Sequence, residues 1–140
     1  MPRKSASLLA NPRPTDEKIT INVGCVDLGQ IDLLVQEGFY ANRTDLIRTA
    51  IRNQLALQAD VVKEVVSRKA LVLGIQQFTS ADLQAVQAAG QRLEIRVLGL
   101  AAIAADVPPA LAQSTIESIT VLGALHASAA VKAALAGRIR

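Results

Sequence analysis

Polar and apolar side chains alternate strictly over residues 18–23, a short stretch near the start of the chain. Lys18, Thr20 and Asn22 are the polar members, and Ile19, Ile21 and Val23 are the apolar ones. A period of two predicts one half-buried β-strand. The segments that follow have helical spacing, so this strand has no nearby partner. Because an unpaired strand leaves backbone groups and an apolar face in water, we expect a second copy of the chain to pair with it.

Two amphipathic helices are predicted after the strand. The first covers about residues 26–37, and Gly38 suits its C-terminus. The second begins at Asn42, whose side chain suits an N-cap, and Asp45 lies in its first turn, where negative charge is favourable. Apolar residues continue at helical spacing beyond this point, so we predict that the second helix ends only near Arg68.

Composition divides the chain into three parts. Residues 1–16 carry Arg3, Lys4 and three prolines, which is typical of a flexible basic arm. Residues 17–69 have mixed charges and are predicted to form a globular, dimeric domain. Residues 70–140 contain only nine charged residues and 18 alanines, and we interpret them as a separate domain.

An internal repeat of 24 residues runs through this last part. Residues 95–99 return as 119–123 and residues 107–112 as 131–136, and over the whole of residues 95–112 nine of eighteen aligned positions are identical. A weaker third copy begins at Val72, one residue out of step. Each unit is predicted as a short strand that stops at glycine, a turn and a short Ala-rich helix. Such repeats are typical of a solenoid, and a compact α/β domain with a duplicated unit is the alternative.

The last unit shows no polar capping segment in the sequence, so we expect an uncapped end. An uncapped stack leaves an apolar end or a strand edge exposed. We therefore predict that residues 70–140 are a self-association domain that joins dimers into higher oligomers.

Several classes of protein are disfavoured. The single Cys25 cannot form an internal disulfide and is expected to be a small buried filler, and the single His126 is expected to be a surface or packed residue rather than a ligand. No catalytic constellation, metal site or cofactor motif is present, so we expect no enzyme and no cofactor. No apolar stretch is long enough for a signal peptide or a membrane span, and we expect a cytoplasmic, nucleoid-associated protein. The net charge of +3 does not by itself identify a partner.

Residues 17–55 resemble the ribbon-helix-helix family of DNA-binding proteins, the Arc-like and CopG-like repressors. The most specific part is residues 38–48, with a glycine, a short turn, and then Asn42, Arg43 and Thr44 opening the second helix. The resemblance implies an α+β fold in which two chains form an antiparallel two-stranded ribbon and four helices. A solenoid-like strand and helix repeat would follow in residues 70–140.

The resemblance also implies a DNA-binding site. Lys18, Thr20 and Asn22 would read base edges in the major groove, which admits a two-stranded ribbon. Asn42, Arg43 and Thr44 would bind phosphates at a helix N-terminus, and Arg3 and Lys4 would add backbone or minor-groove contacts. Arg48 and Arg52 share one helix face, either as further contacts or as a solvated surface.

These features predict a sequence-preferring protein that binds double-stranded DNA, a transcriptional repressor acting as a dimer or higher oligomer. Two other interpretations stay open. One is an architectural, filament-forming protein that organises DNA. The other is an antitoxin-type interaction protein that regulates its own operon, although its partner-binding half would be expected to be more polar than residues 70–140 are.

Overall fold

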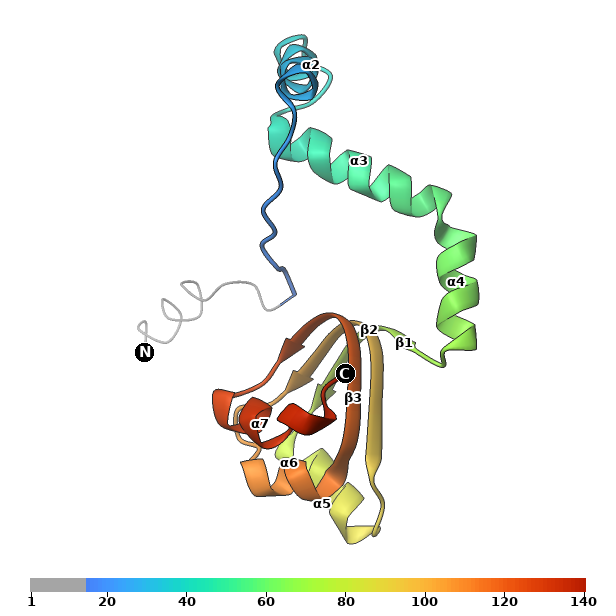
Figure 1. Ribbon diagram of the computed structural model, residues 1–140, viewed down its shortest axis with the longest axis vertical. Helices are drawn as coiled ribbons and strands as arrows, with labels where there is room; N and C mark the ends of the chain where they lie inside the picture. The colour runs from blue at the N-terminus through green and yellow to red at the C-terminus, as the bar shows by residue number, and fades with distance from the viewer. Residues whose placement is uncertain (1–14) are drawn as a thin grey trace, which may run out of the picture. The chain divides into compact units, whose positions relative to one another are not determined.

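The computed structural model describes residues 15–140, which divide into two compact units. Residues 18–65 form one unit, and residues 66–140 with residues 15–17 form the other. The described part of the chain is a mixed α and β structure with six α-helices and one three-stranded parallel sheet (Figure 1).

In the unit of residues 18–65, helix α2 (Cys25–Gln36) ends where the sequence predicts, at Gly38. Gly38 has a φ of +84°, and its amide donates to the carbonyl of Val35 at 3.1 Å. The amide of Phe39 donates to the carbonyl of Leu34 at 3.0 Å. These two bonds are a Schellman motif, which satisfies the last carbonyls of the helix and requires the left-handed conformation that glycine adopts easily.

Helix α3 (Arg43–Leu57) begins at the predicted cap and ends earlier than predicted. Asn42 Oδ1 accepts a hydrogen bond from the amide of Asp45 at 2.8 Å. The prediction of one helix to Arg68 is wrong, because Gln58 interrupts it and a separate helix, α4 (Ala59–Arg68), follows. The Gln58 amide is shared between the carbonyls of Gln54 and Leu55, which tightens the last turn, and Asp60 favours a new helix start.

No residue of α2, α3 or α4 is buried in the single chain. Residues 18–24 lie in no helix or strand, and Ile19 and Ile21 are 75% and 63% exposed. The predicted strand therefore stays a prediction that requires a second copy. Cys25 is exposed, so its expected burial is wrong, because this unit has no interior to hold it. Tyr40, in the turn between α2 and α3, is only half-buried.

The second unit is built from alternating strands and helices. The strands are β1 (Val72–Phe78), β2 (Leu93–Ile103) and β3 (Ile116–His126), all parallel and in the order β1-β2-β3. Helix α5 (Ser80–Ala88) joins β1 to β2, and α6 (Pro109–Thr115) joins β2 to β3. Helix α7 (Ala129–Ala134) and a 3₁₀ turn (Ala136–Arg138) follow β3. The three helices lie on one face of the sheet (Figure 1).

All buried hydrophobic residues of the described chain lie between residues 71 and 135. All three helices contribute to a single cluster, α5 with Leu83, α6 with Leu111 and Ala112, and α7 with Val131. The sheet contributes alternate residues, including Ile95 and Val97, as a strand with one covered face requires. The core is aliphatic, with Phe78 as the one aromatic side chain packed against it within the described residues.

The sheet pairs the copies of the sequence repeat with one another. Ile95 pairs with Ile119, and Gly99 pairs with Gly123, each 24 residues further on. Gly74 of β1 pairs with Gly99, 25 residues on, which is the one-residue offset seen in the weaker third copy. The interpretation as a solenoid stays a prediction, since a compact α/β domain has the same layout of three strands.

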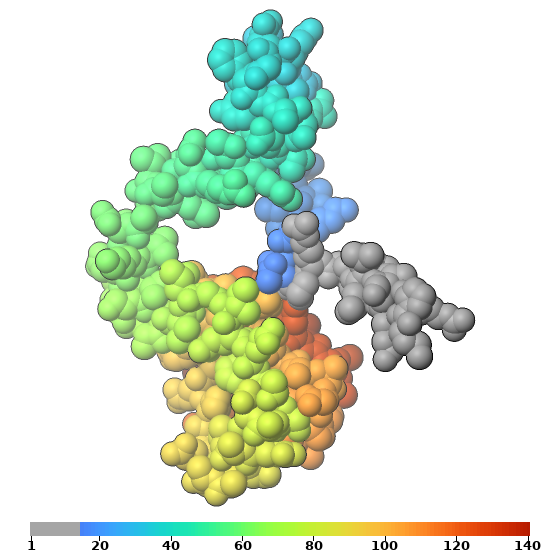
Figure 2. All heavy atoms as spheres, turned by 180° about the vertical axis from the view of Figure 1, so that it is seen from behind, coloured from blue at the N-terminus to red at the C-terminus, as the bar shows by residue number. Residues whose placement is uncertain are grey.

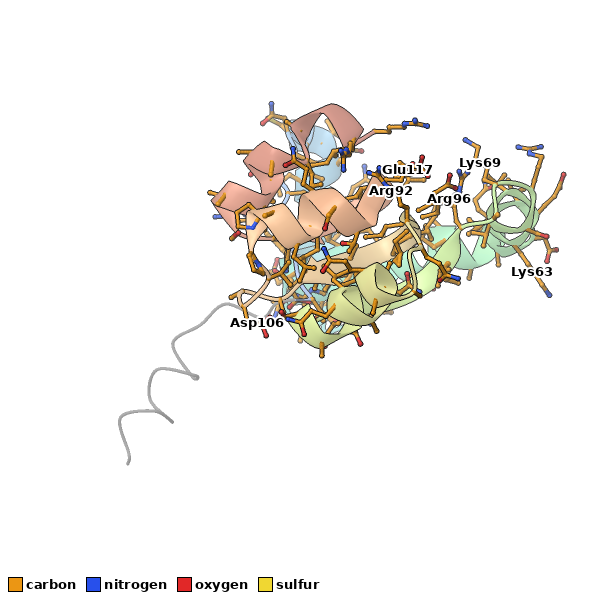
Figure 3. The ribbon with its side chains drawn as sticks, turned by 90° about the horizontal axis from the view of Figure 1, so that it is seen from below. Lys63, Lys69, Arg92, Arg96, Asp106 and Glu117 are labelled. Carbon is orange, nitrogen blue, oxygen red and sulfur yellow. The ribbon has the colours of Figure 1, made fainter. Side chains whose placement is uncertain are left out.

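The two ends of the strands differ in their surroundings. At the amino end, the Arg96 guanidinium donates to the carbonyl of Lys69 at 2.7 and 3.1 Å, and Figure 3 shows Arg96 and Lys69 together. At the same end, the outer edge of β3 is covered, because Ile139 forms a β-bridge with Ile119. The expectation of an uncapped last strand is therefore wrong for the first part of β3.

Replacing Gly99 by alanine should destabilise the unit of residues 66–140. A Cβ on Gly99 would lie 2.2 Å from the carbonyl oxygen of Gly74, and its φ is +139°. Together, the collision and the strained backbone should lower the free energy of unfolding by about 3 kcal/mol or more, measured by urea denaturation. The control is Gly137→Ala, where a Cβ meets nothing within 4 Å. Equal effects of the two substitutions would contradict this account of the sheet.

Candidate nucleic-acid interface

The start of α3 presents backbone donors with no internal partner. Asn42 caps the helix through the amide of Asp45, and Asp45 Oδ2 accepts from the amide of Ala41 at 3.0 Å. The amides of Arg43 and Thr44 have no acceptor within residues 15–140. Free amides and the positive end of the helix dipole make this turn suited to binding an anion such as phosphate.

The Arg43 side chain is held by the neighbouring helix. Its Nε and Nη2 donate to the two carboxylate oxygens of Asp32 in α2, at 2.7 and 2.8 Å. The hydrogen bond from Arg43 lowers the pKa of Asp32 below its ordinary value and raises the pKa of Arg43. This bidentate pair joins α2 to α3, with the geometry that makes arginine a specific carboxylate partner.

Two further arginines lie beside the start of α3. Arg48 and Arg52 line an open depression of about 300 Å³ together with Asn42, Thr44 and Asp45. Residues four positions apart share a helix face, which brings Arg48 and Arg52 to one side of α3 along with the helix cap. Two of the three residues predicted to bind phosphate thus lie with the two arginines, while the side chain of Arg43 is directed to Asp32.

The residues predicted to read bases are accessible. Lys18, Thr20 and Asn22 are exposed, and their side chains form no hydrogen bond or ion pair with the other described residues. Their apolar neighbours are also exposed, so in the single chain neither face of this segment is covered. Arg3 and Lys4 lie outside the described residues.

His126 lies in the unit of residues 66–140, where its Nε2 is 2.8 Å from Glu17 Oε1. It is half-buried, which agrees with the expectation of a surface or packed residue.

A family model of DNA-binding regulators matches the chain over residues 14–132. The chain therefore belongs to the Ribbon-Helix-Helix transcriptional regulator family. The match extends past the segment that carries the sequence resemblance and includes the three-stranded sheet. No curated protein and no solved structure is significantly similar to the chain. Among the described residues, no helix has both the length and the apolar character needed to cross a membrane.

Replacing Asp32 by asparagine should lower the stability of the helical unit at neutral pH and have less effect in acid. The pKa of Asp32 is lowered by Arg43, so its contribution is present above the ordinary aspartate pKa of about 4 and is lost as the pH falls below it. Urea denaturation followed by circular dichroism should show the wild-type advantage at pH 7 shrink below pH 4.

Glu64→Gln is the matched control, because Glu64 is exposed on α4 and forms no ion pair with another described residue. A difference between wild type and Asp32→Asn that did not change with pH would contradict the ion pair as its source.

Proposed function

We propose that this protein is a sequence-preferring, DNA-binding transcriptional repressor that acts as a dimer or a higher oligomer. The observation that carries the proposal is the family match over residues 14–132 together with the capped, arginine-lined start of α3. Regulators of this family bind DNA and typically form dimers, and residues 18–65 fit such an arrangement.

Dimerisation follows from the missing interior of this unit. Ile19 and Ile21 of the predicted strand and Leu55 of α3 are each more than half exposed. Burying apolar surface is worth about 25 cal/mol per Å², so a second copy that covers these side chains provides the stabilisation that the single chain lacks. In the proposed dimer, residues 18–23 of the two chains pair antiparallel, and their apolar side chains face the helices.

The opposite face of the ribbon then carries Lys18, Thr20 and Asn22 from both chains. Lysine can donate to guanine, and asparagine can form a bidentate pair with adenine. Threonine can donate, accept or offer its methyl group to thymine. Two equivalent half-ribbons favour a pseudo-palindromic site, and phosphates bound at the start of α3 would set the register of the protein on the duplex.

A second candidate function is an architectural protein that coats DNA. The observation that favours it is the unpaired outer edge of β1 among the described strands, since a free strand edge can bind another chain. Footprinting of the full-length protein on genomic DNA distinguishes the two functions. A short palindromic footprint supports a repressor, and a footprint that spreads with protein concentration supports a coat.

Replacing both Thr20 and Asn22 by alanine should remove discrimination between sequences while the dimer persists. Each lost base contact should reduce discrimination by about 1–3 kcal/mol. Fluorescence anisotropy with a selected site and a scrambled site measures the difference, and light scattering measures the dimer. Gln84→Ala, at an exposed position of α5, is the control. Undiminished selectivity in the double variant would refute the ribbon as the reading surface.

Replacing Arg43 by alanine should weaken binding to every DNA sequence. In the proposed complex the Arg43 guanidinium leaves Asp32 for a phosphate, and loss of that one contact per chain should reduce the slope of log K against log salt by about 2 for a dimer. Asp32→Asn separates this role from the structural one, since it breaks the same ion pair and keeps the guanidinium. If Asp32→Asn weakened binding as much as Arg43→Ala, the ion pair rather than a phosphate contact would explain the loss.

A further inference from the structure

Each strand of the sheet carries one glycine with a positive φ, and the three glycines pair with one another across the sheet. A Cβ on Gly99 would lie 2.2 Å from the carbonyl oxygen of Gly74, and a Cβ on Gly123 would lie 2.1 Å from that of Gly99. Each of these glycines has a φ between +120° and +139°, which side chains rarely tolerate. Glycine is therefore required in β2 and β3 because the carbonyl of the preceding strand occupies the Cβ position.

Gly74 also has a positive φ, but no neighbouring carbonyl lies where its Cβ would be. Its φ is +127°, and a Cβ built on it meets nothing within 4 Å. Among the described strands none precedes β1, and the outer side of β3 at Gly123 carries no further strand. At the first edge of the sheet, the position that a glycine carbonyl occupies beside Gly99 and Gly123 is therefore open, and the last edge presents such a carbonyl at Gly123.

The side chains at these two edges are apolar and uncovered. On β1, Leu73 is 66% and Ile75 is 56% exposed, and on β3 Leu122 is 53% exposed. In the middle strand, Leu98, which lies between Leu73 and Leu122 in the register, is half-buried. Leu100, which pairs with Ile75, is only 6% exposed. In the space-filling view the yellow-green atoms around β1 lie at the molecular surface (Figure 2). A further strand on each edge would lie beside these side chains as β1 and β3 lie beside Leu98 and Leu100, and would reduce their exposure.

We propose that β3 of one copy of this chain adds in parallel to β1 of the next copy, so that the sheet continues from chain to chain. Gly123 lies beside Gly74 of the neighbour, and Leu122 lies beside its Leu73, which repeats the register within the chain. The bridge from Ile139 to Ile119 confines the contact to the later part of β3. Because β1 begins at Val72, the partner of Val121 in this register, its strand fits the part of the edge that is left free.

This arrangement uses two different surfaces, so it is head-to-tail and forms either a closed ring or an open array. Pairing of two β1 strands around a two-fold axis would leave the carbonyl of Gly123 unused. It would also run the strands antiparallel, unlike every pair in this sheet. The contact between β3 and β1 does not require DNA. It joins one dimer of the protein to the next.

Sedimentation of the full-length protein without DNA tests the proposal. Wild type should form species heavier than a dimer whose mass rises with concentration, and Leu73→Lys and Leu122→Lys should each return it to a dimer. Ala110→Lys, at an exposed position of the middle helix α6, should leave the assembly unchanged. A wild type that stays dimeric at all concentrations overturns the proposal. So does an assembly that Leu73→Lys dissociates and Leu122→Lys does not, because that pattern indicates pairing of two β1 strands.

Cysteine cross-linking gives a second readout that does not depend on a disruptive charge. In a Cys25→Ser background, Leu73→Cys and Leu122→Cys proteins are oxidised separately and as a mixture. The neighbouring positions of adjacent strands lie within disulfide reach, so a covalent dimer should form in the mixture only. A covalent dimer in Leu73→Cys alone, or none in the mixture, overturns head-to-tail pairing.

Discussion

Burial of apolar side chains is divided unequally between the two units, and the behaviour of the protein depends on this division. The unit of residues 66–140 has a closed aliphatic core between its sheet and three helices. The unit of residues 18–65 has no buried residue on any of its helices, although it is rich in isoleucine, leucine and valine. A chain that completes one core by itself and leaves another incomplete is suited to a permanent partner at the incomplete one.

In the unit of residues 18–65, polar contacts fix the positions of α2 and α3, because no buried apolar side chain holds these helices together. The cap at Asn42 fixes where α3 begins, and the Asp32–Arg43 pair fixes α2 against that start. Both contacts are exposed, and each is worth little in isolation. Their value lies in orientation, because they hold the free amides of α3 at a defined place.

Local signals in the sequence were sufficient for features that depend on neighbouring residues. Gly38 and Asn42 mark helix ends through their own backbone and side-chain chemistry, and both lie where the sequence predicts. The 24-residue spacing of the repeat reappears in the sheet, where Ile95 pairs with Ile119. The roles of Lys18, Thr20 and Asn22 rest on the family resemblance and stay predictions.

Features that depend on distant residues were not predictable in this way. Asp32 and Arg43 are eleven positions apart on different helices, and no periodic pattern links them. The interruption at Gln58 leaves no mark in the apolar pattern, because apolar residues continue at helical spacing on both sides of it. The break itself involves the single Gln58 amide, which is shared between two carbonyls. The common burial of cysteine predicts Cys25 inside, and that preference has no effect in a unit that lacks an interior.

The scarcity of aromatic residues gives the molecule a useful optical property. Tyr40 is the single tyrosine of the chain, no tryptophan is present, and the core of residues 71–135 is aliphatic with only Phe78 against it. Tyrosine emission therefore reports on residues 18–65 alone, whereas far-ultraviolet dichroism reports on both units. The same sample thus provides two independent signals, one for the assembly of the helical unit and one for the folding of the whole chain.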